Sequence, residues 1–262
     1  MTSTTFERMI YVMQQLLICI VVGFAAELID GAMGMAYGVS SNTFLRSVGI
    51  PSAISSACVH IAELFTTLVS GLSHLRLKNV SRALFVRLLL PGIIGGALGA
   101  YLLVSFESST LDAIIDLYLI VMGVVIFCKA FQKERPPREY GNYVCPLGLL
   151  GGFTDALGGG GWGPIVTSTL LATNHDTRKT IGTVNTVEFF VTVAETTTFV
   201  AMLQDFRSYT MVILGLIIGG VAAAPLGALL CKKIPVKVML GFVGALVIFL
   251  NVVKLLQHAG WM

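Results

Sequence analysis

Residues 154–164 read TDALGGGGWGP, and this stretch decides how the rest of the chain is interpreted. It places one carboxylate, Asp155, beside four consecutive glycines and Trp162, with strongly apolar runs on either side. Glycine lowers helix stability, so four in a row end or break a helix. Inside a membrane, the backbone groups exposed by such a break are tolerated only where protein or a water-filled cavity surrounds them. The stretch therefore predicts the tip of a helical hairpin that faces a site within a membrane protein.

The composition of the chain supports a membrane location. Of 262 residues, 55% are hydrophobic and 12% are charged, whereas a soluble domain carries about 25% charged residues. Charge-free runs of about 20 residues, long enough to cross a bilayer, recur along the chain. The net charge of +3 is spread over short loops, and the five cysteines show no metal-ligand or disulfide spacing. We expect an all-α polytopic membrane protein without cofactor, bound metal or nucleic-acid partner, whose apolar helix faces contact lipid or a second copy in a homo-oligomer.

A weaker copy of the same stretch is DGAMGMAYG at residues 30–38. The two copies align without a gap at an offset of 125 residues, with eight identities over 38 positions. Two of the identical pairs are carboxylates and two are glycines of the predicted tips, which a chance match does not explain. The pairs are Asp30/Asp155, Gly34/Gly159, Gly38/Gly163, Leu45/Leu170, Val59/Val184, Glu63/Glu188, Phe65/Phe190 and Thr67/Thr192.

Each repeat is expected to contain a broken helical hairpin followed by three transmembrane helices. The first repeat spans 1–131, a cytoplasmic linker spans 132–141, and the second repeat spans 142–262. An odd number of helices after each hairpin gives two inverted repeats, the plan of many secondary transporters. The first break is predicted at residues 30–34, and Arg46 marks the loop that follows. The predicted hairpins are 10–48 and 142–174, and the helices are 52–75, 83–105, 110–128, 179–203, 209–231 and 235–257.

Basic residues predict the side of the membrane on which each loop lies, because Lys and Arg favour cytoplasmic loops. With this arrangement, one side collects 13 of the 17 Lys and Arg residues. The other side keeps Arg8, Arg46, Arg207 and Lys254. The 129–141 loop is therefore expected in the cytoplasm, and both termini are expected outside.

Carboxylates within the apolar segments are the strongest indication of a functional site. Burying one in a bilayer costs about 2.5–3.5 kcal/mol, so such residues are generally functional or paired. Glu63 and Glu188 are expected to carry protons or to organise the tips. Asp30 and Asp155 precede the second arms of the hairpins, where they either cap free N–H groups or take part in substrate or proton chemistry. Glu27 and Glu195 have no acidic counterpart in the other repeat and rank below these four.

The predicted tips also favour binding of a small anion near the midplane. A helix that begins there offers free N–H groups, and consecutive glycine N–H groups form an anion-binding nest. Because ionised carboxylates repel an anion, we expect Glu63 or Glu188 to be protonated when it binds, which couples transport to protons. The candidate substrate-binding residues are Gly34, Tyr37, Thr43, His60, Gly159, Gly160, Gly161, Trp162, Ser168 and Asn185.

Three other functions remain open at this point. A cation or metal-ion transporter would use the buried carboxylates and His60 as ligands. An intramembrane enzyme is disfavoured because no nucleophile has a base and an orienting group at recognisable spacing. A structural or receptor role is disfavoured by the repeat and its buried carboxylates.

Long segments of the chain carry a family resemblance. They are IDGAMGMAYGVSSNTFL (29–45), SACVHIAELFTTLVSGLSHLRLKNV (56–80), GGFTDALGGGGWGPIVTSTLLA (151–172) and IGTVNTVEFFVTVAE (181–195). Together they resemble the TauE/SafE sulfite exporter family. The resemblance implies a multi-pass plasma (inner) membrane carrier that exports a small anion such as sulfite or an organosulfonate, driven by proton gradients. Gly158 to Gly161 match the family's glycine-rich motif, whereas Met33, Met35 and Ala36 depart from it in the first repeat.

Overall fold

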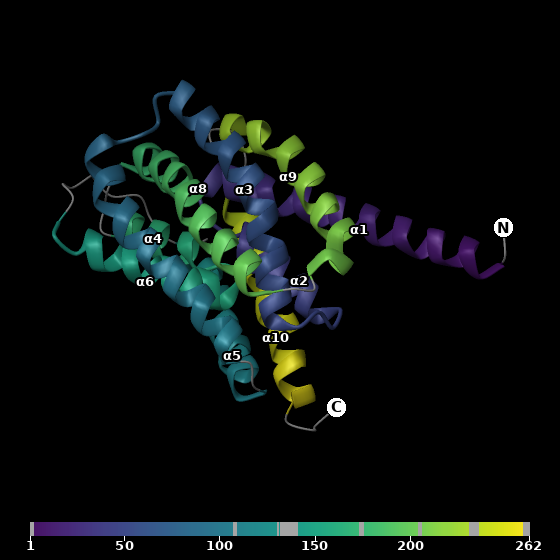
Figure 1. The fold of residues 1–262 in the computed structure, drawn as a ribbon. Helices are drawn as coiled ribbons and strands as arrows, with labels where there is room; N and C mark the ends of the chain where they lie inside the picture. The colour runs from purple at the N-terminus through teal and green to yellow at the C-terminus, as the bar shows by residue number, and fades with distance from the viewer. Residues whose placement is uncertain are drawn as a thin grey trace.

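The computed structural model describes residues 3–106, 109–129, 131, 141–172, 176–203, 206–230 and 236–258. The regular elements within these ranges are all helices, packed in a bundle from which the N-terminal part of α1 projects (Figure 1). Their bounds are α1 (Ser3–Met33), α2 (Tyr37–Ser47), α3 (Ser52–Arg76), α4 (Arg82–Ser105), α5 (Ser109–Lys129), α6 (Val144–Gly158), the π-helix η1 (Gly163–Thr167), α7 (Ser168–Ala172), α8 (Thr177–Met202), the 3-10 helix η2 (Phe206–Tyr209), α9 (Thr210–Leu230) and α10 (Val236–His258).

Both chain breaks occur at glycines with a left-handed backbone. α6 ends at Gly158, and Gly159 and Gly160 follow with φ of +61° and +152°. α1 ends at Met33, and Gly34 follows with φ of +68°. The aligned glycines Gly34 and Gly159 therefore make the same turn, which costs another residue about 1–2 kcal/mol.

The predicted start of the first break, at Asp30, is wrong. α1 continues through Met33, and the N–H of Gly34 still donates to the carbonyl of Asp30 at 2.5 Å. Asp30 thus lies in the last turn of the helix, where local i to i+4 hydrogen bonds outweigh the low helix propensity of its neighbour Gly31.

Helices of the two halves cover each other in matching pairs. α1 packs most extensively on α9, and its counterpart α6 packs on α4. α3 contacts α8 and α9, while α8 contacts α3 and α4, and α5 runs beside α10 (Figure 1). Exchanging the two halves turns the α1–α9 contact into the α6–α4 contact and the α3–α9 contact into the α8–α4 contact, and it leaves the α3–α8 and α5–α10 contacts unchanged. The first arm of each hairpin is therefore covered mainly by a helix from the other half.

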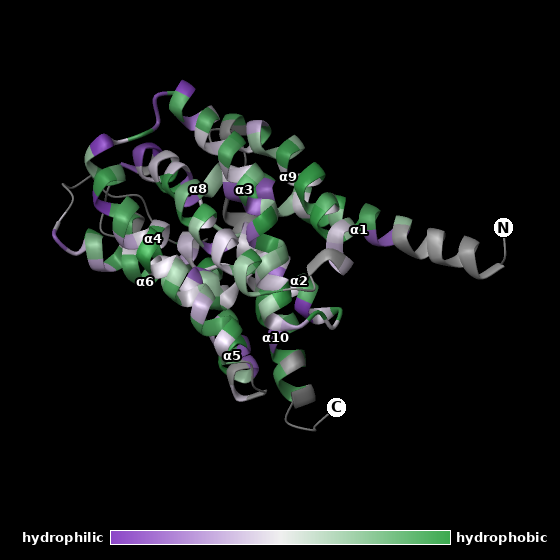
Figure 2. Ribbon diagram, in the orientation of Figure 1, coloured by the Kyte–Doolittle hydropathy of each residue, from purple (hydrophilic) through white to green (hydrophobic). Residues whose placement is uncertain are grey.

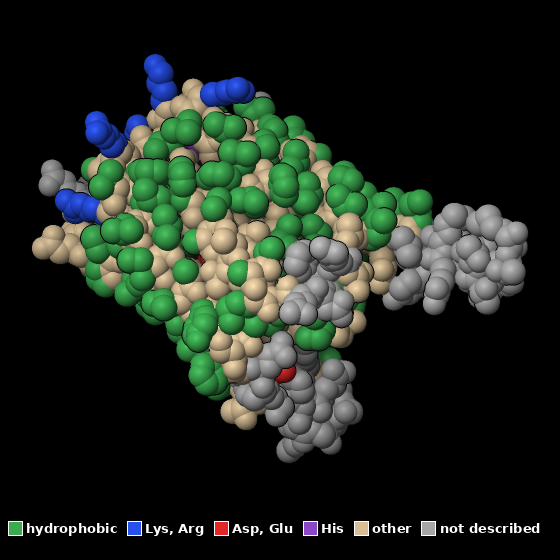
Figure 3. All heavy atoms as spheres, viewed as in Figure 1, with side chains coloured by type: hydrophobic (Ala, Val, Ile, Leu, Met, Phe, Trp, Pro, Cys, Tyr) green, Lys and Arg blue, Asp and Glu red, His purple; other side chains and the backbone are tan. Residues whose placement is uncertain are grey.

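The outer surface is apolar over most of its extent. Four helical segments in the described ranges are long and apolar enough to cross a membrane: Met13–Met33, Ser52–Arg76, Arg82–Ser105 and Thr210–Gly227. Hydrophobic side chains cover most of the face seen in Figure 3, and Lys and Arg side chains gather at one end, where α3 ends and α4 begins. On α4, Val86 and Leu90 are each 63% exposed. Such a surface matches the hydrocarbon of a bilayer.

The two hairpin tips cross in direct contact. A Cβ atom added at Gly38 would lie 2.6 Å from Gly160 Cα, and one added at Gly163 would lie 2.6 Å from Gly34 O. Gly38 and Gly163 are an aligned pair of the repeat, so the same close approach explains both glycines. The crossing leaves no room for a substrate between Gly38 and Gly160 in this conformation.

Hydrogen bonds between the hairpins accompany the crossing. Thr167 Oγ1 donates to the carbonyl of Gly34 at 2.7 Å, and Asn42 Nδ2 donates to the carbonyl of Gly158. Thr167 and Asn42 are 125 residues apart, at aligned positions of the repeat. Each second arm thus supplies a donor to a carbonyl at the end of the other hairpin's first arm, where helical partners run out.

Arg46 does not mark a loop as predicted. It lies inside α2 with a side chain that is fully buried, and its Nη1 is 2.6 Å from Asp116 Oδ1 on α5. Its Nη2 donates to the carbonyl of Asp112 at 3.2 Å. The ion pair explains why a charged side chain is tolerated in the interior and fixes α2 against α5.

Alanine at either crossing glycine is expected to destabilise the protein. A methyl group at Gly38 or Gly163 would press on the backbone of the other tip, which cannot move aside cheaply, at a cost of about 1–3 kcal/mol or more. Thermal unfolding of the purified Gly38→Ala and Gly163→Ala variants in detergent measures this. Gly241→Ala is the matched control, because a Cβ there meets nothing within 4 Å. Unfolding temperatures equal to that control would contradict the crossing.

Removing one member of the buried ion pair should cost more than removing both. Arg46→Leu leaves Asp116 buried without that counter-charge, and breaking a buried pair from one side costs about 3–5 kcal/mol. The double variant Arg46→Leu/Asp116→Leu should recover part of the loss in the same unfolding measurement. Additive losses would show that the two side chains do not depend on each other.

Candidate functional site

The six carboxylates of the apolar segments are all buried, as is His60. Each of these seven side chains is at most 5% exposed. Hydrophilic positions interrupt the hydrophobic ones along α3, which supplies His60 and Glu63 (Figure 2). Among the described Lys and Arg residues, only Arg46 is buried, and its partners are on α5. The carboxylates are distributed as Glu27 and Asp30 on α1, Glu63 on α3, Asp155 on α6, and Glu188 and Glu195 on α8.

Both aspartates hold the start of a second arm. Asp155 Oδ1 accepts the N–H groups of Gly161 at 2.6 Å and Trp162 at 3.0 Å. Asp30 Oδ1 accepts the N–H of Tyr37 at 3.2 Å, seven residues on, as Trp162 is from Asp155. These hydrogen bonds are the ones that the capping interpretation of the two aspartates expects. Their carboxylates satisfy N–H groups that have no helical partner.

The expected anion nest at the glycine tip is already filled. The N–H groups of Gly159 and Gly160 donate to the backbone carbonyl of Asp155, and those of Gly161 and Trp162 donate to its side chain. The protein thus supplies its own backbone carbonyl to two of these donors and its own carboxylate to the other two. In this conformation all four N–H groups already have a partner in Asp155, and none is left for a free anion.

Tyr37 and Trp162 anchor the second arms to neighbouring helices. Tyr37 OH donates to the carbonyl of Leu216 on α9 at 3.3 Å. Trp162 Nε1 donates to the carbonyl of Val184 on α8 at 3.3 Å, and its ring is fully buried. A large ring whose one polar atom is paired with backbone is typical of a packed core.

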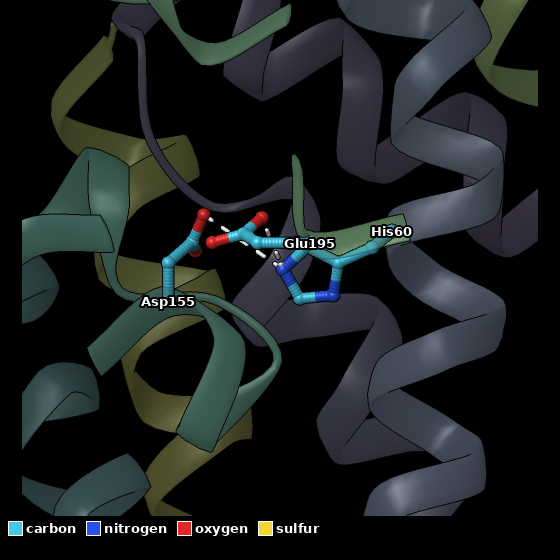
Figure 4. Close-up of side chains that lie close together, drawn as sticks. All are labelled: His60, Asp155 and Glu195. Atoms are coloured by element: carbon cyan, nitrogen blue, oxygen red, sulfur yellow. Dashed lines mark ion pairs between the residues drawn. The ribbon is translucent and has the colours of Figure 1, made fainter. Parts of the chain in front are cut away.

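His60 is the point at which three carboxylates meet. Its Nε2 lies 3.1 Å from Glu195 Oε2, 3.8 Å from Asp155 Oδ2 and 3.8 Å from Glu63 Oε2. Figure 4 shows the carboxylates of Asp155 and Glu195 turned toward the imidazole ring. The three side chains come from α3, α6 and α8, so the site forms only when both halves of the chain are packed together.

Glu195 was ranked low from the sequence, yet its carboxylate is the closest of the three to His60. It follows Glu188 by seven residues, which places it near the same helix face, and this spacing was the available signal. Gly96 makes room for it, since a Cβ there would lie 2.6 Å from Glu195 Oε1. Glycine at position 96 therefore leaves the space that the Glu195 carboxylate occupies.

A second polar group lies beside the first tip. Asn185 Nδ2 donates to Ser70 Oγ at 3.1 Å, whereas Asn185 Oδ1 has no hydrogen-bond partner among the described residues. A Cβ at Gly34 would lie 3.2 Å from both Asn185 Oδ1 and Thr167 Oγ1. Gly34, Asn185 and Thr167 thus converge. Gly34 and Asn185 are two of the predicted substrate-binding residues, and the structure places Thr167 and Ser70 beside them.

The remaining predicted ligands have partners in the protein. Thr43 Oγ1 accepts a hydrogen bond from Asn251 Nδ2 at 3.0 Å, which ties α2 to α10. Ser168 Oγ lies 3.8 Å from Met35 Sδ. As it stands, the site presents acidic oxygens and one imidazole nitrogen, which attract protons and cations. An anion can approach only when that negative charge is neutralised.

Comparison with known proteins gives a consistent result. The family described as "Sulfite exporter TauE/SafE" matches residues 19–253. The chain is 36% identical over 254 residues to the "Probable membrane transporter protein YtnM" of Bacillus subtilis (strain 168), covering 94% of this chain and 84% of that protein. No solved structure matches the chain significantly.

Replacing Asp155 should separate its capping role from its charge. Asp155→Asn keeps an oxygen for the N–H groups of Gly161 and Trp162, whereas Asp155→Ala leaves two buried donors unpaired, at about 1–3 kcal/mol each. We expect the unfolding temperature to fall further for alanine than for asparagine. Asp30→Ala is the internal comparison and should cost less, because Asp30 accepts one such bond. Equal losses for asparagine and alanine would contradict the capping role.

Proposed function

Because the chain belongs to the TauE/SafE sulfite exporter family of membrane transporters, we propose that it exports a small sulfur oxyanion, such as sulfite or an organosulfonate, coupled to protons. The proposed substrate class rests on family membership, which extends over most of the chain. The position proposed for the substrate rests on the convergence of Gly34, Thr167 and Asn185 beside the tip crossing. The amide nitrogen of Asn185 has a second hydrogen besides the one that it donates to Ser70, and it can donate this hydrogen to an oxyanion without a basic side chain.

The architecture proposed for this transport is a pair of inverted repeats. Support comes from the exchange symmetry of the helix contacts and from the reciprocal bonds of Thr167 and Asn42. The clustering of exposed Lys and Arg where α3 ends and α4 begins supports a cytoplasmic position for that end. In this proposal the 132–141 linker is also cytoplasmic, and the substrate lies near the bilayer midplane beside the tips.

Proton coupling follows from the charge conflict at the site. Several ionised carboxylates next to a bound oxyanion would repel it strongly at low dielectric. Neutral Glu63 and Glu188 lower that repulsion, so the binding of the anion and the binding of protons depend on each other. A Cβ atom at Gly38 would lie 3.0 Å from Glu63 Oε1, so the carboxyl group of Glu63 lies directly beside the crossing of the tips.

A cation transporter is the second candidate, favoured by one observation. Ligand atoms of His60, Asp155 and Glu195 lie within 4.8 Å of one another, in a buried site with no adjacent basic side chain among the described residues. Uptake of a cation that ignores sulfite, sulfonates and sulfate would favour this candidate over the anion transporter.

Sulfite flux into proteoliposomes, with and without an imposed pH gradient, tests the primary proposal. We expect saturable flux that the gradient accelerates. Asn185→Ala should reduce it by about tenfold or more, since a hydrogen bond to a charged group contributes about 1.5–3 kcal/mol. Glu63→Gln and Glu188→Gln should retain flux but respond less to the gradient.

Asn79→Ala is the matched control for the Asn185 substitution, because Asn79 pairs with His74 near the loop between α3 and α4. It should transport like the unaltered protein. Absence of flux for sulfite, sulfonates and sulfate would overturn the substrate class. Full gradient dependence in both glutamine variants would overturn the coupling residues while leaving the anion assignment intact.

A further inference from the structure

The orientation of the His60 ring fixes which of its nitrogens faces the carboxylates. His60 Nδ1 lies 2.7 Å from the backbone carbonyl of Ser56, which can only accept a hydrogen bond. Nδ1 therefore carries the hydrogen, and in the neutral ring Nε2 is left with its lone pair. Nε2 is buried and points toward Glu195 and Asp155 (Figure 4).

The atoms around this lone pair are all electron donors. Asp155 Oδ2, Glu63 Oε2 and both carboxylate oxygens of Glu195 are buried and make no hydrogen bond of acceptable geometry with the described residues, and the same holds for His60 Nε2. Even the 3.1 Å approach of Glu195 Oε2 to His60 Nε2 is off the direction that a hydrogen bond requires. Converging lone pairs in a buried site are unfavourable unless a positive ion lies between them.

We propose that His60, Asp155 and Glu195 bind one divalent transition-metal ion of the Zn²⁺ or Mn²⁺ type. Their ligand atoms lie within 4.8 Å of one another, and a small inward movement gives the metal–ligand distances of about 2.0–2.2 Å that such ions adopt. The imidazole nitrogen selects these ions over Mg²⁺ and Ca²⁺, which take oxygen ligands. A divalent ion also cancels two buried negative charges without any Lys or Arg.

The residues behind the ligands are arranged as in protein metal sites. The carbonyl of Ser56 holds the His60 ring, and Ser56 Oγ donates to the carbonyl of Ala156 at 2.7 Å, next to Asp155. The other oxygen of Asp155 is held by the N–H groups of the tip, which leaves Oδ2 directed at the site. Ligands fixed by such outer contacts lose little freedom when an ion binds.

The test of the metal site does not depend on which substrate the protein transports, because the test measures binding and not transport. Purified full-length protein, freed of any affinity tag and treated with chelator, is dialysed against Zn²⁺, Mn²⁺ or Mg²⁺, and its metal content is measured. We expect saturable uptake of a single Zn²⁺ or Mn²⁺ per chain, no retention of Mg²⁺, and a higher unfolding temperature with the bound ion.

His60→Gln and Glu195→Gln should lose the bound ion. Glu27→Gln, which alters a buried carboxylate outside the three ligands, should keep it. Co²⁺ gives a second readout in the unaltered protein, independent of how the variants fold. A nitrogen and oxygen site gives weak visible bands, whereas thiolate charge-transfer absorption would place the ion at cysteine and overturn the proposal. Lack of saturable binding, or binding that survives His60→Gln, would also overturn it and show that only protons occupy the site.

Discussion

The reciprocal crossing of the two hairpin tips is the constraint on which the rest of the structure depends. Gly38 and Gly163 let each second arm lie against the other tip, and no larger side chain fits at either position. The crossing explains why Thr167 and Asn42 satisfy carbonyls of the opposite hairpin. It also brings α6 against α3, where Asp155 meets His60, while the packing of α8 on α3 brings Glu195 to the same ring.

The repeat in the sequence predicted the parts of this arrangement that depend on local backbone geometry. An aspartate seven residues before the start of a second arm reaches the N–H groups there, whatever lies around it, so Asp30 and Asp155 could be interpreted as caps. Glycines at the two aligned tips predicted that a helix ends there, and Gly34 and Gly159 each directly follow the end of a helix. Burial of the carboxylates followed from their positions in apolar segments.

Properties that depend on long-range packing could not be predicted in the same way. Arg46 looked like a loop residue because its counter-charge, Asp116, is 70 positions away on another helix. Glu195 was undervalued because it has no partner in the repeat, and its importance comes from His60 on α3. The glycine N–H groups were assigned to a free anion because spacing alone does not reveal that Asp155 occupies them.

The crossing also has a consequence for biosynthesis. The first half of the chain leaves the ribosome before the second half exists, so Gly38 has no Gly160 to lie against and Thr167 is not yet present to bind Gly34. Glu27, Asp30 and Glu63 have meanwhile entered the bilayer without the helices that bury them. Neither tip can therefore make the contacts seen in the structure until the other hairpin has also been synthesised.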